Sequence, residues 1–363
     1  MKRLALLLGS LLVVTAAASA KEVVPAPVVV EEAPVQIIEK EVIVYREKEQ
    51  GFRPNGYVDL QYRYYDKTED QKNLWNTNDE SSRTQLKTKI NMTENQTLEA
   101  RIRDYNTLSQ DSTYTTTDEG KEVLTSGTTE TRLRYWYNHG NVGDSKVNLD
   151  SRLEYKNYDT TQYVEYQAQF DFAEYLFNND FIKTDYFQIA PKYRYTWSDD
   201  NSSNYTNGVG LDIYSYYTLP AGFSAELNVY ATENFYGQSR ATADGKTAED
   251  SFGVSVEAYL YNTTNLYTNG NYTVDLGFEG GFDSYNWSQE KILKNADLTS
   301  TDSNSTYSLY ALPYVQVNYQ ATEFVNLYAA VGAEYRNWMI TDRHAAQDWR
   351  WQPTAWAGFN VAF

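Results

Sequence analysis

The sequence closes on the stretch Trp349-Arg350-Trp351-Gln352-Pro353-Thr354-Ala355-Trp356-Ala357-Gly358-Phe359-Asn360-Val361-Ala362-Phe363. Every second residue, counted from Trp349, is apolar, and the residues between them, counted from Arg350, are mostly polar. Successive side chains of a strand point to opposite faces, so this pattern predicts a strand with one apolar face. An apolar band between aromatic ends is typical of a strand that faces lipid in a transmembrane barrel.

The same alternation recurs along the chain from Gly56 onward. Each run is close to the ~9–11 residues that a tilted barrel strand needs to cross a bilayer. The sequence therefore predicts an all-β fold, a transmembrane antiparallel up-and-down β-barrel of about fourteen strands over residues 56–363, with twelve or sixteen strands as alternatives. The predicted strands are Gly56–Asp66, Arg83–Met92, Thr97–Asn106, Thr129–Asn138, Ser145–Lys156, Gln162–Ala173, Tyr186–Trp197, Asn207–Thr218, Phe223–Glu233, Ser251–Tyr261, Tyr272–Tyr285, Thr306–Tyr319, Phe324–Trp338 and Trp349–Phe363.

The connections between these strands fall into two classes. Short turns follow the even strands, whereas several long polar segments follow odd strands: Lys67–Ser82, Thr107–Thr128, Gly237–Asp250 and Asn286–Ser305. Short periplasmic turns that alternate with long external loops are typical of bacterial outer-membrane barrels, and a soluble β-sandwich has no reason to sort its loops in this way. We therefore expect a multi-pass protein of the Gram-negative outer membrane, in contact with its lipid and lipopolysaccharide, with both chain ends in the periplasm.

The N-terminus predicts export. Lys2 and Arg3 precede an apolar run, and Ala18-Ser19-Ala20 has the small-x-small form of a cleavage site, so we expect a signal peptide over residues 1–20, cut between Ala20 and Lys21. A membrane anchor is the alternative, but the run is shorter than the ~20 residues of a spanning helix. Residues 21–55 are rich in Pro, Val and Glu and predict a periplasmic linker, in which Ile37–Tyr45 forms either a short helix or flexible chain.

Composition agrees with a barrel and excludes other classes. The chain has 34 Tyr and 8 Trp, which suit strands and membrane interfaces. Its mean hydropathy of -0.64 is low because barrel strands alternate. The net charge of -18 argues against a nucleic-acid partner, which requires a basic surface. There is no Cys, so disulfides do not stabilise the exported chain.

The face opposite the apolar one carries the candidate functional residues. Its predicted pore-lining cations gather on the first seven strands: Arg63, Arg83, Lys87, Lys89, Arg101, Arg103, Arg132, Arg134, Lys146, Arg152, Lys156, Lys192 and Arg194, with only Arg336 and Arg350 later. The predicted pore-lining acids of the later strands are Asp212, Glu226, Glu257, Asp275, Glu279, Asp283 and Glu334. Opposed basic and acidic walls would create a transverse field in a water-filled lumen. The alternative is local pairing that only stiffens the wall, such as Asp150 with Arg152 or Glu99 with Arg101.

Enzymatic sites are poorly supported. The two histidines, His139 and His344, are expected at opposite ends of the barrel, and neither has an evident Ser or Asp partner. No Cys or His pair has metal-ligand spacing, and no phosphate-binding loop occurs. The acidic segment Ser198-Asp199-Asp200-Asn201 lacks the spaced ligands of a calcium site. We expect no catalytic site, metal or cofactor.

Several segments carry a resemblance to a known family. They are Lys21-Glu22-Val23-Val24-Pro25-Ala26-Pro27, Val42-Ile43-Val44-Tyr45-Arg46, Arg53-Pro54-Asn55-Gly56, Leu133-Arg134-Tyr135-Trp136-Tyr137-Asn138, Ser151-Arg152-Leu153-Glu154, Phe170-Asp171-Phe172-Ala173, Leu327-Tyr328-Ala329-Ala330 and Trp349-Arg350-Trp351-Gln352-Pro353-Thr354-Ala355. Through them the chain resembles the fusobacterial major outer-membrane porins, the FomA-type family. The resemblance implies a homotrimeric, voltage-gated diffusion channel for ions and small hydrophilic solutes.

Two further expectations concern partners. The aromatic last residue, Phe363, looks like the signal that barrel assembly machinery reads on bacterial outer-membrane proteins. The resemblance also implies a surface antigen that takes part in adhesion between cells. An alternative function is therefore a surface adhesin or receptor that binds host or bacterial surface ligands through its long external loops.

Overall fold

The computed structural model describes residues 51–69, 80–108, 128–158, 160–198, 204–242, 244–290, 305–340 and 346–363. The chain divides into two units, one formed by Met1–Arg53 with Phe363 and the other, a barrel, by Pro54–Ala362. The barrel is described by itself. The predicted signal peptide, its cleavage site between Ala20 and Lys21, and the linker up to residue 50 lie outside the described residues, as do residues 109–127, residues 291–304 and His344.

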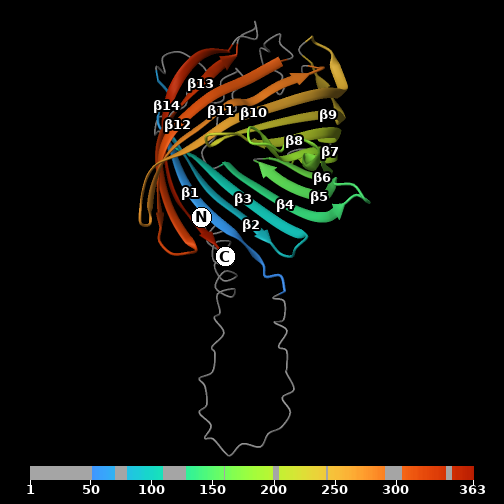
Figure 1. The fold of residues 1–363 in the computed structure, drawn as a ribbon. Helices are drawn as coiled ribbons and strands as arrows, with labels where there is room; N and C mark the ends of the chain where they lie inside the picture. The colour runs from blue at the N-terminus through green and yellow to red at the C-terminus, as the bar shows by residue number, and fades with distance from the viewer. Residues whose placement is uncertain are drawn as a thin grey trace, which may run out of the picture. The chain divides into compact units, whose positions relative to one another are not determined.

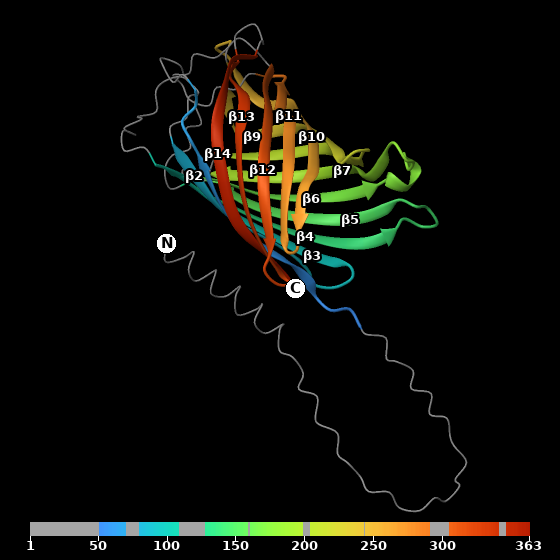
Figure 2. The ribbon, with the colours of Figure 1, turned by 60° about the vertical axis from the view of Figure 1, so that its left-hand side comes forward.

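Within the described ranges the barrel contains fourteen antiparallel strands that close into a ring (Figure 1). Each strand pairs with its neighbours in sequence, and β1 closes the ring against β14, from Tyr57 opposite Ala362 to Tyr65 opposite Thr354. The strands run obliquely around the barrel (Figure 2). Their bounds are β1 Asn55–Tyr65, β2 Ser81–Asn91, β3 Gln96–Thr107, β4 Thr128–Asn141, β5 Asn148–Tyr158, β6 Thr161–Asp171, β7 Lys183–Ser198, β8 Tyr205–Thr218, β9 Phe223–Ala241, β10 Thr247–Asn269, β11 Tyr272–Ser288, β12 Ser305–Gln320, β13 Val325–Ile340 and β14 Ala346–Ala362.

The predicted strand number and order are confirmed. Most ends agree with the sequence prediction within three residues, because the alternation of apolar and polar side chains marks each membrane-length segment. A 3-10 turn, Ala173–Tyr175, lies between β6 and β7. No helix among the described residues is long and apolar enough to span a membrane.

One hairpin region differs from the prediction. Gly237–Asp250 was predicted as a long loop, but β9 continues to Ala241 and β10 begins at Thr247, which leaves a short turn. At its other end β10 continues to Asn269, where the prediction placed its end at Tyr261. Residues 263–272 are exposed on both faces. Since a two-stranded ribbon in water has no apolar face, alternation fails there while the backbone hydrogen bonds to β11 continue.

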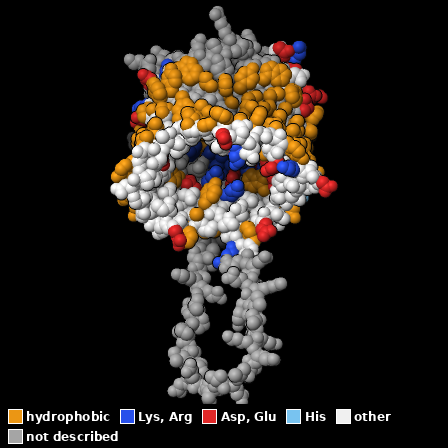
Figure 3. Space-filling view, in the orientation of Figure 1, with side chains coloured by type: hydrophobic (Ala, Val, Ile, Leu, Met, Phe, Trp, Pro, Cys, Tyr) orange, Lys and Arg blue, Asp and Glu red, His pale blue; other side chains and the backbone are white. Residues whose placement is uncertain are grey.

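The two faces of the sheet differ as the alternation predicts. Large apolar side chains are exposed on the outside, for example Leu153 at 49% and Val331 at 63%. The most deeply buried large side chains are polar and charged, including Glu154, Glu165 and Gln167. Figure 3 shows apolar side chains banding the outer surface, and Lys, Arg, Asp and Glu side chains inside the hollow. The barrel therefore has an apolar exterior and a charged interior.

Candidate functional site

A network of ion pairs lines the inner face of β3, β4 and β5. Arg101 lies 2.5 Å from Glu130, and Arg132 lies 2.6 Å from Glu99. In register, Lys87, Arg101, Arg132 and Lys156 sit directly opposite one another on four consecutive strands. Like charges directly opposite on neighbouring strands destabilise a sheet. The carboxylates of Glu99 and Glu130, placed diagonally, compensate this repulsion, and Glu130 also contacts Lys156 at 3.2 Å.

The network continues into the most buried part of the wall, on β5 to β8. Glu165 accepts hydrogen bonds from Arg152 at 2.6 Å and from Arg194 at 2.7 Å. Lys192 Nζ lies 2.6 Å from Asp212 Oδ1, and both side chains are almost fully buried, at 2% and 1% exposed. Gly210 makes this pair possible, because a Cβ there would lie 2.8 Å from Lys192 Cε. Because each of these cations contacts a carboxylate, we expect the pairs to stiffen the wall and to have little effect on ion selectivity.

Other cations of the first strands have no carboxylate partner closer than 4.0 Å within the described chain. Arg63 donates to Thr354 Oγ1 at 2.9 Å and stacks over the Trp356 ring at 4.8 Å. Arg83 donates to Gln61. Arg103 donates to Gln85 and is 4.0 Å from Glu130. Among the described residues, neither Lys87 nor Lys89 forms an ion pair. The inner face of β1 to β3 therefore keeps an excess of positive charge.

The predicted acids of the later strands are held mainly by tyrosine hydroxyls. Tyr261 donates to Glu226 at 2.9 Å, Tyr230 donates to Glu257 at 2.9 Å, and Tyr310 donates to Glu279. A hydroxyl orients a carboxylate but leaves its charge in place. The inner face of β9 to β11 thus keeps an excess of negative charge.

The remaining predicted residues lie in mixed clusters. Arg336 bridges Glu334 at 2.5 Å and Asp283 at 2.7 Å, and Arg350 sits opposite Arg336 in register. Asp275 accepts from Asn318 at 2.8 Å. Arg134 lies 2.5 Å from Glu154. Lys146 is not on the inner face: the turn before β5 holds it 3.9 Å from Glu174, because β5 begins only at Asn148.

The local ion pairs suggested by the sequence are wrong in detail. Asp150 accepts from Asn138 instead of Arg152, and Glu99 pairs with Arg132 instead of Arg101. Glu130 and Glu165, which hold much of the network together, were not singled out from the sequence. Glu130 is two residues from Arg132, and Glu165 is two residues from Gln167. Because residues two apart in a strand share a face, this spacing could have placed both glutamates on the inner face.

His139 has a partner that the sequence did not reveal. Its Nε2 lies 2.8 Å from Ser151 Oγ, which in turn lies 3.0 Å from Tyr166 Oη. His139 and Tyr166 are exposed, and Ser151 is half-buried. No carboxylate hydrogen-bonds the imidazole among the described residues, so the acid of a hydrolase triad is missing there. No group of His, Cys, Asp or Glu that could hold a metal occurs in the part of the chain that the structure describes.

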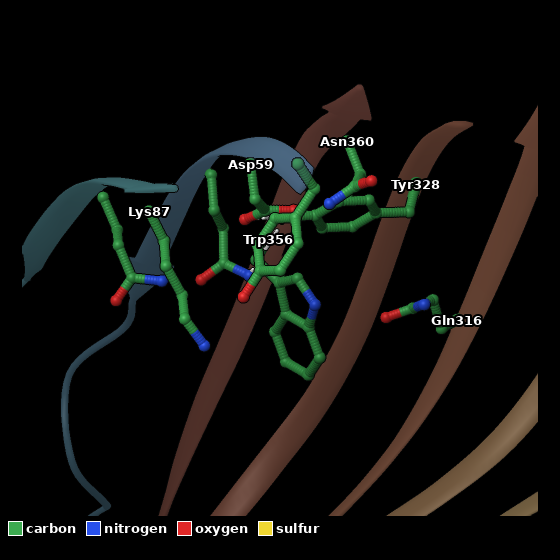
Figure 4. Close-up of a pocket in the computed structure, with 9 residues that line it drawn as sticks. Asp59, Lys87, Gln316, Tyr328, Trp356 and Asn360 are labelled. Atoms are coloured by element: carbon green, nitrogen blue, oxygen red, sulfur yellow. Dashed lines mark hydrogen bonds between the residues drawn. The ribbon is translucent and has the colours of Figure 1, made fainter. Parts of the chain in front are cut away.

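A cavity of about 420 Å³ opens on the inner face where the ring closes (Figure 4). It is lined by residues of β1, β2, β12, β13 and β14, including Asp59, Lys87, Gln316, Tyr328, Trp356 and Asn360. Its volume lies in the range of small-molecule sites, roughly 300–1,000 Å³.

No protein-family model and no curated protein matches the sequence. The fold is similar to solved outer-membrane barrels. The outer membrane channel DcaP of Acinetobacter baumannii is 10% identical over 86% of this chain and 96% of that chain, with a TM-score of 0.35. The anion-selective porin from Comamonas acidovorans is 11% identical over 86% and 99%, with a TM-score of 0.32. The trimer form of OmpT from Vibrio cholerae is 9% identical over 86% and 99%, with a TM-score of 0.32. These similarities assign the chain to no family.

Proposed function

We propose that the chain is an outer-membrane porin, a water-filled channel for passive diffusion of ions and small hydrophilic solutes. One observation carries the proposal: a closed barrel exposes apolar side chains outside and keeps its charges inside. A charged interior holds water, and an apolar exterior suits lipid. Reconstituted vesicles should swell in isotonic monosaccharide and not in a large dextran. Vesicles that stay unswollen in every small solute would refute the proposal.

The split of charge suggests how the channel sorts solutes. By strand order, the cation-rich β2 and β3 lie across the ring from the acid-rich β9 and β10. Opposed charges across a narrow aqueous passage produce a transverse field. A polar solute gains energy by aligning with this field, whereas an apolar solute must displace ordered water without that gain. The channel would therefore favour polar and dipolar solutes.

An arginine introduced on the outer face tests whether that face lies in lipid. Leu153 lies mid-strand on β5 and is among the most exposed apolar side chains. Leu153→Arg should destabilise the membrane-inserted barrel by about 2–4 kcal/mol, the cost of Arg at the bilayer midplane. The measurement is the urea midpoint for unfolding from lipid vesicles. Leu153→Tyr is the matched control, and an unchanged midpoint for the arginine variant would contradict a lipid-facing position.

The proposal includes assembly in the outer membrane. Resemblance to the fusobacterial porins supports a homotrimer with both chain ends in the periplasm and with Phe363 read by barrel assembly machinery. The mass of the detergent-solubilised particle, corrected for bound detergent, tests the trimer. The loops of the alternative adhesin function lie largely outside the described residues.

A further inference from the structure

A cation and an anion on the inner face are register partners on neighbouring strands but form no salt bridge. Asp59 of β1 and Lys87 of β2 are direct register partners on the same face. Such a pair normally forms a salt bridge that stabilises the sheet. Here no nitrogen–oxygen contact within 4.0 Å joins them, although other ion pairs of this wall have nitrogen–oxygen distances of 2.5–2.6 Å.

Each charge is turned toward a different neighbour. Asp59 accepts hydrogen bonds from Tyr328 Oη at 3.0 and 3.1 Å. Tyr328 can reach it because Gly358 leaves room: a Cβ there would lie 2.6 Å from Tyr328 Oη. Lys87 lies over the Tyr57 ring, with Nζ 5.9 Å from its centroid. Figure 4 shows the Lys87 side chain extending apart from Asp59, which lies beside Tyr328 and Asn360.

Both charges line the cavity of about 420 Å³, and its lining adds hydrogen-bonding groups that no described residue engages. The Oε1 atom of Gln85 accepts from Arg103, so its amide N–H groups remain as donors. The Nε2 atom of Gln316 donates to Asn318, so its oxygen remains as an acceptor. The Tyr57 and Trp356 rings provide apolar surface. The cavity thus combines a cation, an anion, amide groups that no described residue engages, and aromatic surface.

We propose that this cavity is a binding subsite for small zwitterions of the α-amino acid class. The Lys87 ammonium and the Gln85 amide would bind the carboxylate, and the Asp59 carboxylate would bind the ammonium. The aromatic rings would contact the solute's side chain. A simple anion meets repulsion from Asp59 and a simple cation meets repulsion from Lys87, whereas a zwitterion satisfies both. This inference rests on the proposed porin function, to which it adds a solute class.

The test uses three solutes of one shape. L-Leucine carries both charges, leucinamide carries only the positive one, and 2-hydroxy-4-methylpentanoate carries only the negative one. Each is offered as competitor for entry of labelled leucine into vesicles that hold the full-length protein, after channel conductance has been recorded. Leucine entry should saturate with concentration, and leucinamide and the hydroxy acid should compete at least about tenfold more weakly, the factor that ~1.4 kcal/mol represents.

Variants complete the test. Lys87→Gln should make leucine entry linear with concentration, and Asp59→Asn should do the same. Lys89→Gln is the matched control, because it removes the same charge from the same strand face outside the cavity lining, and it should leave saturation intact.

Each other outcome overturns the inference. Linear entry of leucine in the unaltered protein would show that there is no subsite. Equal competition by leucinamide or by the hydroxy acid would show a simple cation or anion subsite instead. Loss of saturation in Lys89→Gln equal to that in Lys87→Gln would show that general wall charge is responsible. Absence of conductance in the first recording would refute the porin function itself, which separates the two failures.

Discussion

Asp212→Asn is expected to destabilise the barrel by about 3–5 kcal/mol, the usual cost of removing one partner from a buried ion pair. The pair that it breaks is the most enclosed in the described wall, with Lys192 at 2% and Asp212 at 1% exposed. Gly210 fits the Lys192 side chain closely against β8, so the ammonium cannot easily turn toward water. The measurement is the urea concentration at which half of the protein in lipid vesicles is unfolded.

A double substitution gives the matched comparison. Asp212→Leu combined with Lys192→Met removes both charges and should restore most of the lost stability, because apolar side chains of similar size often replace a buried pair at little cost. Lys246→Gln is the surface control. Its partner Asp244 lies 2.7 Å away, but both side chains are largely exposed, so no measurable change is expected. A double variant as unstable as Asp212→Asn would show that the pair is not the cause.

Removing the uncompensated cations is expected to change ion selectivity. The triple variant Arg63→Gln, Arg83→Gln and Lys87→Gln should move the reversal potential in a salt gradient toward cations. At ~10 Å in water each unit charge changes the energy of a passing ion by roughly 0.4 kcal/mol, so three charges together change the permeability of each ion severalfold, in opposite directions for anions and cations. The shift should shrink at high salt, because screening shortens the reach of exposed charges.

A charge-balanced variant provides the comparison. Arg132→Gln with Glu99→Gln removes one cation and one anion that already contact each other at 2.6 Å, so the reversal potential should barely change. An equal shift in the two variants would mean that the number of side chains removed matters more than their charge. An unchanged reversal potential in the triple variant would contradict the excess of positive charge on β1 to β3.

The sequence predicted the strands well and the contacts between them poorly, for a physical reason. Alternation depends on residues two apart in one strand. It therefore located the strand at Trp349–Phe363 and the thirteen other strands, and it placed Arg101 and Glu226 on the predicted inner face. The extension of β10 to Asn269 was missed because a ribbon in water carries no apolar face. Alternation carries no information about register, and register decides which side chains meet.

The inner wall illustrates that limit. Glu99 meets Arg132 diagonally across β3 and β4, whereas the nearest candidate in sequence was Arg101. Asp59 and Lys87 are opposite in register yet separate, because Gly358 lets Tyr328 approach Asp59 from β13. The separation of Asp59 from Lys87 thus depends on four strands, and β13 and β14 lie more than two hundred residues from β1 in sequence.

Conductance of the purified protein in a planar bilayer tests the central claim most directly. We expect discrete, ohmic current steps as single barrels or assemblies insert, because in the proposed channel the closed wall of β1 to β14 encloses water. A bilayer that stays silent after insertion has been verified by protease protection would contradict an open aqueous channel.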